Sequence, residues 1–180
     1  MRKIFKQNTI ALVYDFDGTL SPQPMQEYTV LPELGVSPRA FWDECQQEAK
    51  KFNADAMLTY MRLLTEKIEA RQTHLSKKKL RALAKDIRYF PGVETWFDRI
   101  NRHVKETSAG KVKIKHYIIS AGLKEILEGV TIRRHFERMY ASEYYFDHHD
   151  AARFPTVVIN DTSKTQYIFR INKGIEDINR

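Results

Sequence analysis

A short apolar run that ends in two carboxylates is the feature that most restricts how this chain of 180 residues can fold. Residues 10–14 form a compact run with β-branched and aromatic side chains, which is typical of a strand buried in a parallel sheet. The hexapeptide Asp-Phe-Asp-Gly-Thr-Leu follows at once, at residues 15–20. The sequence therefore predicts that Asp15 and Asp17 lie at the carboxyl end of a strand.

The segment that follows has the patterning of helices. Ser37 and Pro38 form a helix start, and apolar residues at helical spacing come after them. The same spacing predicts a second helix over residues 57–68 and a third behind Ser76. We therefore expect a bundle of about three helices between residues 23 and 89.

The rest of the chain alternates between predicted strands and helices. Pro91 and Gly92 precede an amphipathic helix, and Gly174 ends the last one. Strands are expected at residues 116–119, 139–142 and 157–160, with helices after Ser120 and from Ser163 or Lys164 to Asn172. This alternation predicts an α/β fold with a doubly wound, parallel, Rossmann-like sheet, in which ligands bind outside the carboxyl ends of the strands.

Three polar signals along the chain resemble the signatures of the haloacid dehalogenase (HAD) superfamily. Residues 15–20 resemble its first signature, Ser120 at a strand end its second, and Lys164 its third. The helical insert is similar to the α-helical cap of phosphoserine-phosphatase-like members. The resemblance implies a Rossmann-like HAD core of residues 1–22 and 90–180 and a cap of residues 23–89.

This resemblance implies a magnesium-dependent phosphomonoester hydrolase that works through an aspartyl-phosphate intermediate. Asp15 would be the nucleophile, and Asp17 would protonate the leaving oxygen and later activate water. Lys164 would balance charge on the nucleophile and on the transition state. Gly18 permits the tight turn beside the two carboxyl groups.

Substrate binding is expected at four further positions. The Ser120 hydroxyl and the backbone amides of Ala121 and Gly122 would donate to phosphate at a helix start, and Thr19 would steady the turn of the first signature. A cap restricts access, so a small phosphorylated metabolite is the expected substrate. No motif within residues 23–89 indicates which metabolite this substrate is.

The implied cofactor is Mg²⁺, held by the Asp15 carboxylate and the Asp17 backbone carbonyl. The superfamily's fourth signature is an acidic pair after a further strand, whereas only Glu176 and Asp177 follow Gly174 here. We therefore expect that the chain stops before its last metal ligand and has low intrinsic activity. An unpaired sheet edge and an uncovered helix face would then favour self-association.

Composition leaves two alternatives open. The net charge of +7, the lysines at 77–79 and the pair Arg133 and Arg134 suit a nucleic-acid surface, but no known nucleic-acid module accompanies them. The second alternative is a catalytically silent HAD-fold scaffold or regulator. A single cysteine, Cys45, and the lack of an export signal or a run of roughly 20 apolar residues predict a cytoplasmic protein with no membrane contact.

Overall fold

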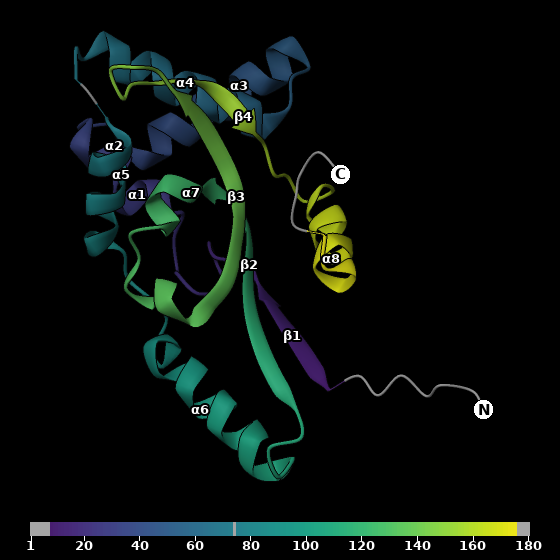
Figure 1. The fold of residues 1–180 in the computed structure, drawn as a ribbon. Coiled ribbons are helices and arrows are strands. Elements are labelled where there is room, and N and C mark those ends of the chain that lie inside the picture. The colour runs from purple at the N-terminus through teal and green to yellow at the C-terminus, as the bar shows by residue number, and fades with distance from the viewer. Residues whose placement is uncertain (1–7, 74, 176–180) are drawn as a thin grey trace.

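A four-stranded sheet lies at the centre of the computed structural model, which describes residues 8–73 and 75–175 (Figure 1). The strands are, in spatial order, β1 (Thr9–Tyr14), β2 (Lys113–Leu123), β3 (Phe136–Phe146) and β4 (Ala152–Val157). The pairs β1–β2 and β2–β3 are parallel and are joined through helices, as parallel neighbours require. The predicted α/β fold is confirmed, but the pair β3–β4 is antiparallel.

The prediction of a strand at residues 157–160 was wrong, because the strand in this region, β4, ends at Val157. A hairpin turn at residues 147–150 joins β3 to β4. The Asp147 carboxylate closes this turn by accepting the backbone amides of His149 and Ala151 at 2.9 and 3.0 Å. Pro155 lies within β4 and lacks an N–H donor, which restricts the strand to the edge of the sheet.

The expectation that residues 10–14 are buried was also wrong. β1 lies at one edge of the sheet, and no other strand of the described part of the chain pairs with its outer side. Ile10 and Val13 are 46% and 36% exposed. The helix α8 (Lys164–Lys173) packs against β1 and β2, but its Ile168 and Phe169 are also exposed. The self-association expected from such a surface stays a prediction.

The predicted helices between residues 23 and 89 are present. They are α3 (Pro38–Phe52), α4 (Ala56–Ala70) and α5 (Lys77–Leu83), preceded by the short helices α1 (Met25–Tyr28) and α2 (Val30–Glu33) and followed by the 3₁₀ turn η1 (Ala84–Asp86). Asp55 caps α4 and Ser76 caps α5, each by accepting backbone amides of the first turn. The boundaries of the predicted cap stay a prediction.

Helices cover both faces of the sheet (Figure 1). The helices α6 (Val93–Thr107) and α7 (Lys124–Leu127), with the 3₁₀ turn η2 (Thr131–His135), lie on the same face as α1, and α8 lies on the other. The main apolar core fills the first face, whereas Tyr167 of α8 packs with Ile119 and Ile159 on the second. Within the described residues, no helix is both long and apolar enough to cross a membrane.

Candidate active site

The hexapeptide at residues 15–20 forms a tight loop directly after β1. The ring of Phe16 is fully buried, and its carbonyl accepts the amides of Leu20 and Ser21 at 2.8 and 3.0 Å. Gly18 has a φ of +75°, a left-handed conformation that side chains disfavour. The expected role of Gly18 in the turn is confirmed, and the loop places the Asp15 side chain at the strand end.

Asp15 and Lys164 are joined across 149 positions of sequence. The Lys164 Nζ lies 2.8 Å from Oδ2 of Asp15, while Oδ1 accepts the amide of Phe16 at 2.8 Å. Lys164 is the first residue of α8, and the turn before it is held by Asn160, whose Oδ1 accepts the Ser163 amide at 2.8 Å. Burial opposes the charge on Lys164, but its hydrogen bond and ion pair with Asp15 outweigh this and raise its pKa.

The carboxyl group of Asp17 is largely shielded from water. Its Oδ1 accepts the backbone amide of Met25, the first residue of α1, at 2.9 Å. Burial raises the pKa of Asp17 to about 7, and the negative charge of Asp15 adds to this effect although the Met25 amide opposes it. A carboxyl group with this pKa can both hold and release a proton near neutral pH.

The segment after Ser120 differs from the expected helix start. β2 continues to Leu123, so Ala121 and Gly122 belong to the strand end and not to the first turn of α7. Ser120 is fully buried, and its Oγ accepts the Gly122 amide at 3.0 Å. The prediction that the backbone amides of Ala121 and Gly122 lie at the start of a helix was therefore wrong, because β2 extends through both residues.

Gly122 brings this strand end into contact with the first signature. A Cβ added at Gly122 would lie 3.2 Å from Oδ2 of Asp17 and 2.2 Å from Cε of Met25. The closest contact is with the end of the Met25 side chain, so a larger residue would fit here only if Met25 moved. The strand ends of β1 and β2 therefore meet as the sheet topology predicts.

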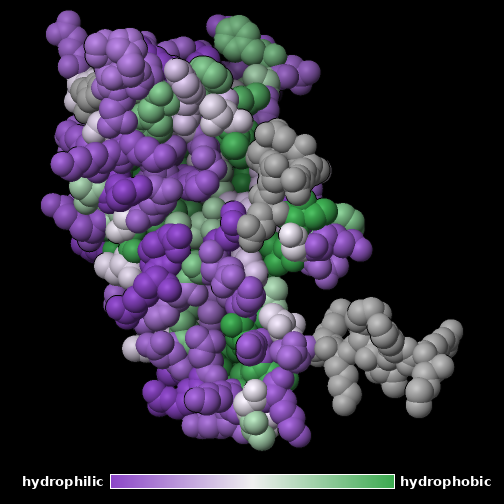
Figure 2. Space-filling view, viewed as in Figure 1, coloured by the Kyte–Doolittle hydropathy of each residue, from purple (hydrophilic) through white to green (hydrophobic). Residues whose placement is uncertain are grey.

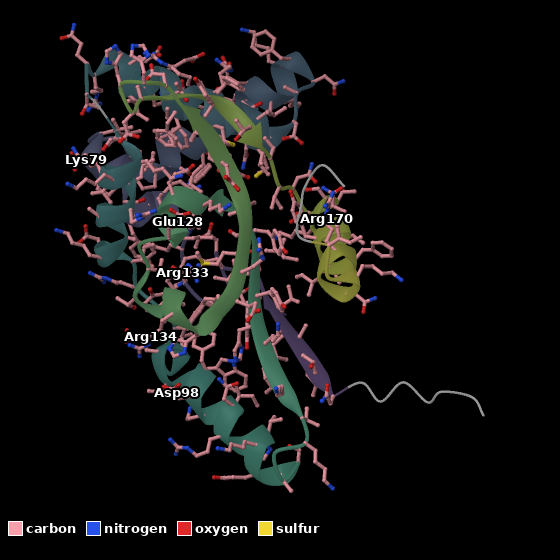
Figure 3. The ribbon with its side chains drawn as sticks, viewed as in Figure 1. Lys79, Asp98, Glu128, Arg133, Arg134 and Arg170 are labelled. Carbon is pink, nitrogen blue, oxygen red and sulfur yellow. The ribbon has the colours of Figure 1, made fainter. Side chains whose placement is uncertain are left out.

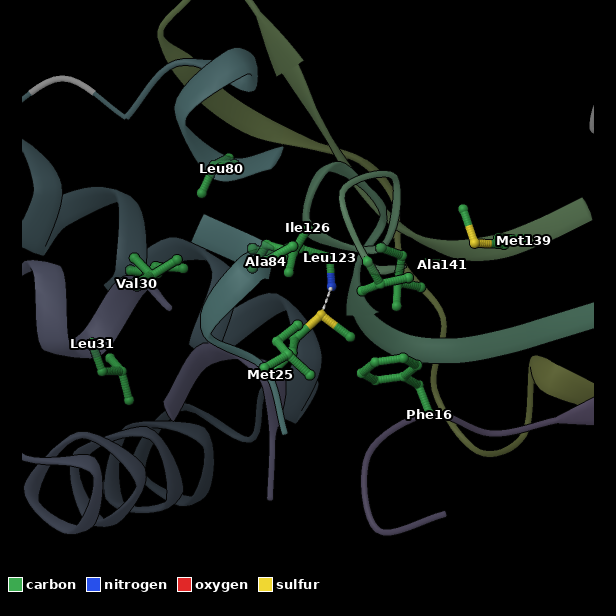
Figure 4. Packing of buried hydrophobic residues seen from close by; sticks show 14 of the residues in the cluster. Phe16, Met25, Val30, Leu31, Leu80, Ala84, Leu123, Ile126, Met139 and Ala141 are labelled. Carbon is green, nitrogen blue, oxygen red and sulfur yellow. Dashed lines mark hydrogen bonds between the residues drawn. The ribbon is translucent and has the colours of Figure 1, made fainter. Parts of the chain in front are cut away.

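Two residues at the site were not predicted from the sequence. The Sδ of Met25 accepts the Leu123 amide at 3.2 Å, so Met25 joins the start of α1 to the end of β2 (Figure 4). Tyr60 of α4 donates its hydroxyl to the Ala121 carbonyl at 3.1 Å. Both residues are largely apolar and lie in helices, and nothing in the neighbouring sequence distinguishes them from ordinary core residues.

Thr19 lies apart from the other predicted site residues. It is exposed, and it lines a separate hollow of about 270 Å³ together with Tyr14, Pro91 and Trp96. Its amide donates to the Phe16 carbonyl at 3.2 Å, which supports the turn. The structure thus places Asp15, Asp17, Ser120, Gly122 and Lys164 at the same edge of the sheet and leaves the Thr19 side chain outside this group.

The donors at this strand end suit a hard divalent cation. The Asp15 carboxylate and the Asp17 backbone carbonyl are oxygen donors of the kind that Mg²⁺ prefers, and Mg²⁺ is usually held by one or two carboxylates together with waters and substrate phosphate. Across residues 8–73 and 75–175, no three His, Cys, Asp or Glu side chains form a ready metal cage. Glu176 and Asp177, the acids that follow Gly174 in the sequence, lie outside the described residues.

Comparison with known proteins gives one similar sequence and several similar structures. No protein-family model matches the chain. An uncharacterised protein of Borreliella burgdorferi is 29% identical over 190 residues, which cover 94% of this chain and 66% of that protein. The chain thus spans slightly less than two thirds of this relative.

The similar structures are hydrolases with low sequence identity to this chain. A HAD family hydrolase from Salmonella enterica serovar Typhi has a TM-score of 0.62 and 20% identity, covering 94% of this chain and 53% of its own. A phosphoserine phosphatase, solved as a phospho-aspartyl intermediate analogue, has a TM-score of 0.60 and 14% identity, covering 94% and 75%. The sequence resemblance and the three-dimensional similarity agree on the fold: this chain has the fold found in a HAD family hydrolase and in a phosphoserine phosphatase.

Proposed function

We propose that this protein is a phosphomonoester hydrolase that forms a phosphoaspartate at Asp15. The observation that carries the proposal is the 2.8 Å contact between Asp15 and Lys164 at the carboxyl end of β1, beside the half-buried Asp17. A nucleophilic carboxylate, a cation and a second carboxyl group are the groups that phosphoryl transfer to an aspartate needs. The shared fold with a phosphoserine phosphatase supports this assignment.

The proposed reaction has two steps at these side chains. In the first, a carboxylate oxygen of Asp15 attacks phosphorus, the bond from phosphorus to the ester oxygen breaks, and protonated Asp17 gives its proton to the leaving alcohol. In the second, ionised Asp17 takes a proton from water, the water oxygen attacks phosphorus, and Asp15 leaves as a free carboxylate with inorganic phosphate. Lys164 offsets negative charge on Asp15 and phosphate in both steps.

We further propose that Mg²⁺ is held by the Asp15 carboxylate and the Asp17 backbone carbonyl. The ion would offset the repulsion between the carboxylates and a phosphate dianion. The Asp15 carboxylate is oriented by the protein itself, because it accepts hydrogen bonds from the Phe16 amide and the Lys164 ammonium group.

Access to the site supports a small phosphorylated substrate. Met25 and Tyr60 are 0% and 2% exposed and cover the strand end of β2 from the side of the helical segment. Helices thus lie beside the strand ends that carry the proposed site, which supports a substrate small enough to reach Asp15 past them. The buried, free thiol of Cys45 supports a reducing compartment such as the cytoplasm.

Hydrolysis of a generic aryl phosphate with and without Mg²⁺ tests the proposal. We expect Mg²⁺-dependent turnover that Asp15→Asn lowers by about 10³-fold or more, because the amide is a poor nucleophile. Asp98→Asn, which changes an exposed carboxylate on α6, is the matched control and should keep full turnover. Equal rates for the wild-type protein and Asp15→Asn would overturn the assignment.

A further inference from the structure

A network of hydrogen bonds joins α6 to β1 and β2, next to the proposed nucleophile. The indole nitrogen Nε1 of Trp96 donates to the hydroxyl of Tyr14 at 2.9 Å. That hydroxyl lies 3.0 Å from Nδ1 of His116, and Nε2 of the same ring lies 3.0 Å from Oδ1 of Asn101. The network thus starts on α6, crosses β1 and β2, and returns to α6. Tyr14 is the residue directly before Asp15, and the proposed reaction steps use none of these four side chains.

The direction of each bond follows from the donors in the network. An indole nitrogen can only donate, so the Tyr14 oxygen accepts from Trp96 and its own proton points to His116. Nδ1 of His116 is therefore unprotonated, and the proton of the neutral ring lies on Nε2, from which it is donated to Asn101. One arrangement of protons thus satisfies every donor, and the Tyr14 hydroxyl is fixed from two sides.

Packing of aromatic rings holds the same residues in place. His116 is 3% exposed, and its ring stacks on that of Tyr14 with centroids 5.8 Å apart. The fully buried ring of Phe97 on α6 meets both rings edge-on, at 5.7 Å from Tyr14 and 5.2 Å from His116. Phe136, the first residue of β3, contacts Tyr14 edge-on at 6.1 Å. Tyr14 is thus held by α6, β2 and β3 together.

The helix α6 is itself attached to neighbouring elements, so it can serve as a fixed support for Tyr14. The ring of His135 in η2 stacks on Phe97 with centroids 4.8 Å apart, and its Nδ1 lies 3.9 Å from Oδ1 of Asp98. Figure 3 shows α6 beside η2, with Asp98 labelled on the helix and Arg134 on the 3₁₀ turn. The solvent side of α6 is mainly hydrophilic, in the lower part of Figure 2. The helix therefore packs on the sheet through one apolar face.

β1 depends on such support because of its place in the sheet. Among the described strands, β2 alone pairs with it, along Thr9–Tyr14. Ile10 and Val13 are exposed, so packing restrains this strand less than a strand in the middle of the sheet. The peptide bond joins Tyr14 directly to Asp15, and it is planar and stiff. A shift of the Tyr14 backbone would therefore move the Asp15 carboxylate as well.

We propose that Tyr14 is a positioning residue, whose hydrogen bonds to Trp96 and His116 hold Asp15 in the orientation from which it attacks phosphorus. The inference rests on the proposed role of Asp15 as the nucleophile. A displacement of reacting groups by about 1 Å can lower the rate by about 100-fold. Loss of the Tyr14 hydroxyl should therefore lower kcat by about tenfold or more. KM should stay within about twofold, because no side chain that touches the substrate changes.

Two substitutions of tyrosine by phenylalanine on adjacent strands form a matched pair. Tyr14→Phe keeps the ring and removes only the hydroxyl. Tyr117→Phe makes the same change on β2, where the ring lines a hollow beside α8 on the other face of the sheet. The Tyr117 hydroxyl has no hydrogen-bond partner in the part of the chain that the structure describes. Turnover of aryl phosphate with Mg²⁺ should fall in Tyr14→Phe and stay within about twofold of the wild type in Tyr117→Phe.

A second variant tests the same network if Tyr14→Phe folds poorly. Trp96→Phe keeps a ring on α6 and removes the donor to the Tyr14 hydroxyl. We expect its kcat to fall by about threefold with KM unchanged, because the bond from Tyr14 to His116 remains. An unchanged kcat in Trp96→Phe would contradict a role for α6 in positioning Asp15.

Hydrogen exchange of backbone amides, followed by NMR, separates positioning from a general loss of stability. The Phe16 amide donates to Oδ1 of Asp15 at 2.8 Å and reports the local geometry. Ile118, fully buried in the interior strand β2, reports global unfolding. In Tyr14→Phe we expect exchange to rise about tenfold at Phe16 and by a smaller factor at Ile118. This measurement needs no turnover, so an inactive wild type would contradict the proposed function while faster exchange at Phe16 would still support the role of Tyr14.

Three results would overturn the inference. Equal kcat in Tyr14→Phe and the wild type would show that the hydroxyl does not position Asp15. A change in KM alone would place the effect in substrate binding. Equal acceleration of exchange at Phe16 and Ile118 would show that Tyr14 contributes only to the stability of the fold.

Discussion

The buried carboxyl group of Glu125 provides a quantitative test of the structure. Glu125 lies in α7 with 2% of its surface exposed, and its Oε1 accepts the Tyr144 amide at 3.3 Å. Its Oε2 has no hydrogen-bond partner among the residues that the structure describes. Burial raises the pKa of Glu125 from 4.5 to about 7. At about 1.4 kcal/mol for each pH unit, keeping this group ionised in the folded protein costs about 3 kcal/mol.

The sign of the effect follows from proton binding. Between pH 4.5 and about 7 the folded protein holds a proton on Glu125 that the unfolded chain releases, so the folded state loses stability as pH rises. Glu125→Gln is neutral at every pH. We therefore expect this variant to match the wild-type protein near pH 4.5 and to have a free energy of unfolding about 3 kcal/mol higher at pH 8.

Urea denaturation at pH 4.5, 6 and 8 measures this difference directly. Other titrating groups cancel between the two proteins, because only one side chain differs. Glu128→Gln, at the exposed end of the same helix, is the control, and its difference from the wild type should stay within about 1 kcal/mol at each pH. A difference for Glu125→Gln that does not change between pH 4.5 and 8 would show that folding does not raise the pKa of Glu125.

Three further predictions concern other contacts. Gly129→Ala should lower the free energy of unfolding by several kcal/mol, because the added Cβ would lie 1.9 Å from the backbone oxygen of Arg81; a thermal melt close to that of the wild type would contradict this. Tyr60→Phe removes the donor to the Ala121 carbonyl and should cost about 1 kcal/mol of stability, with a larger fractional loss of phosphatase turnover; unchanged turnover would show that this bond does not position the strand end. Asp55→Ala removes the acceptor for two backbone amides of α4 and should lower the free energy of unfolding by about 1 kcal/mol in urea denaturation. An unchanged urea midpoint would show that the Asp55 side chain does not stabilise the helix.

Local signals predicted the helices well. Ser37 with Pro38, and Ser76, precede helices that the structure confirms, and Gly174 ends α8 in a left-handed conformation. Such signals act within one turn of the chain, so the sequence contains all that is needed to interpret them.

The strand order could not be inferred in the same way. Residues 10–14 look buried in sequence, but exposure of Ile10 and Val13 depends on which strands flank β1. The antiparallel pairing of β4 depends on a turn that the Asp147 side chain closes, and the alternation of strands and helices in the sequence does not indicate such a turn. These features are set by contacts between distant segments.

For the candidate site, too, some contacts could be predicted from the sequence and others could not. Pairing of Asp15 with Lys164 was predicted, because the carboxyl ends of strands in an α/β sheet meet at one edge. Met25 and Tyr60 were missed, because their contacts with the end of β2 depend on how α1 and α4 pack against the sheet. Both of these side chains look like ordinary core residues in the sequence.

The most direct test of the central claim is to trap the phosphoaspartate. The protein is mixed with aryl phosphate and Mg²⁺, quenched in acid within one turnover, reduced with borohydride to convert any aspartyl phosphate to homoserine, and digested for mass spectrometry. We expect that Asp15 is converted, that Asp17 is not, and that the signal disappears in Asp15→Asn. Conversion at a different residue, or steady turnover with Asp15 never modified, would contradict it.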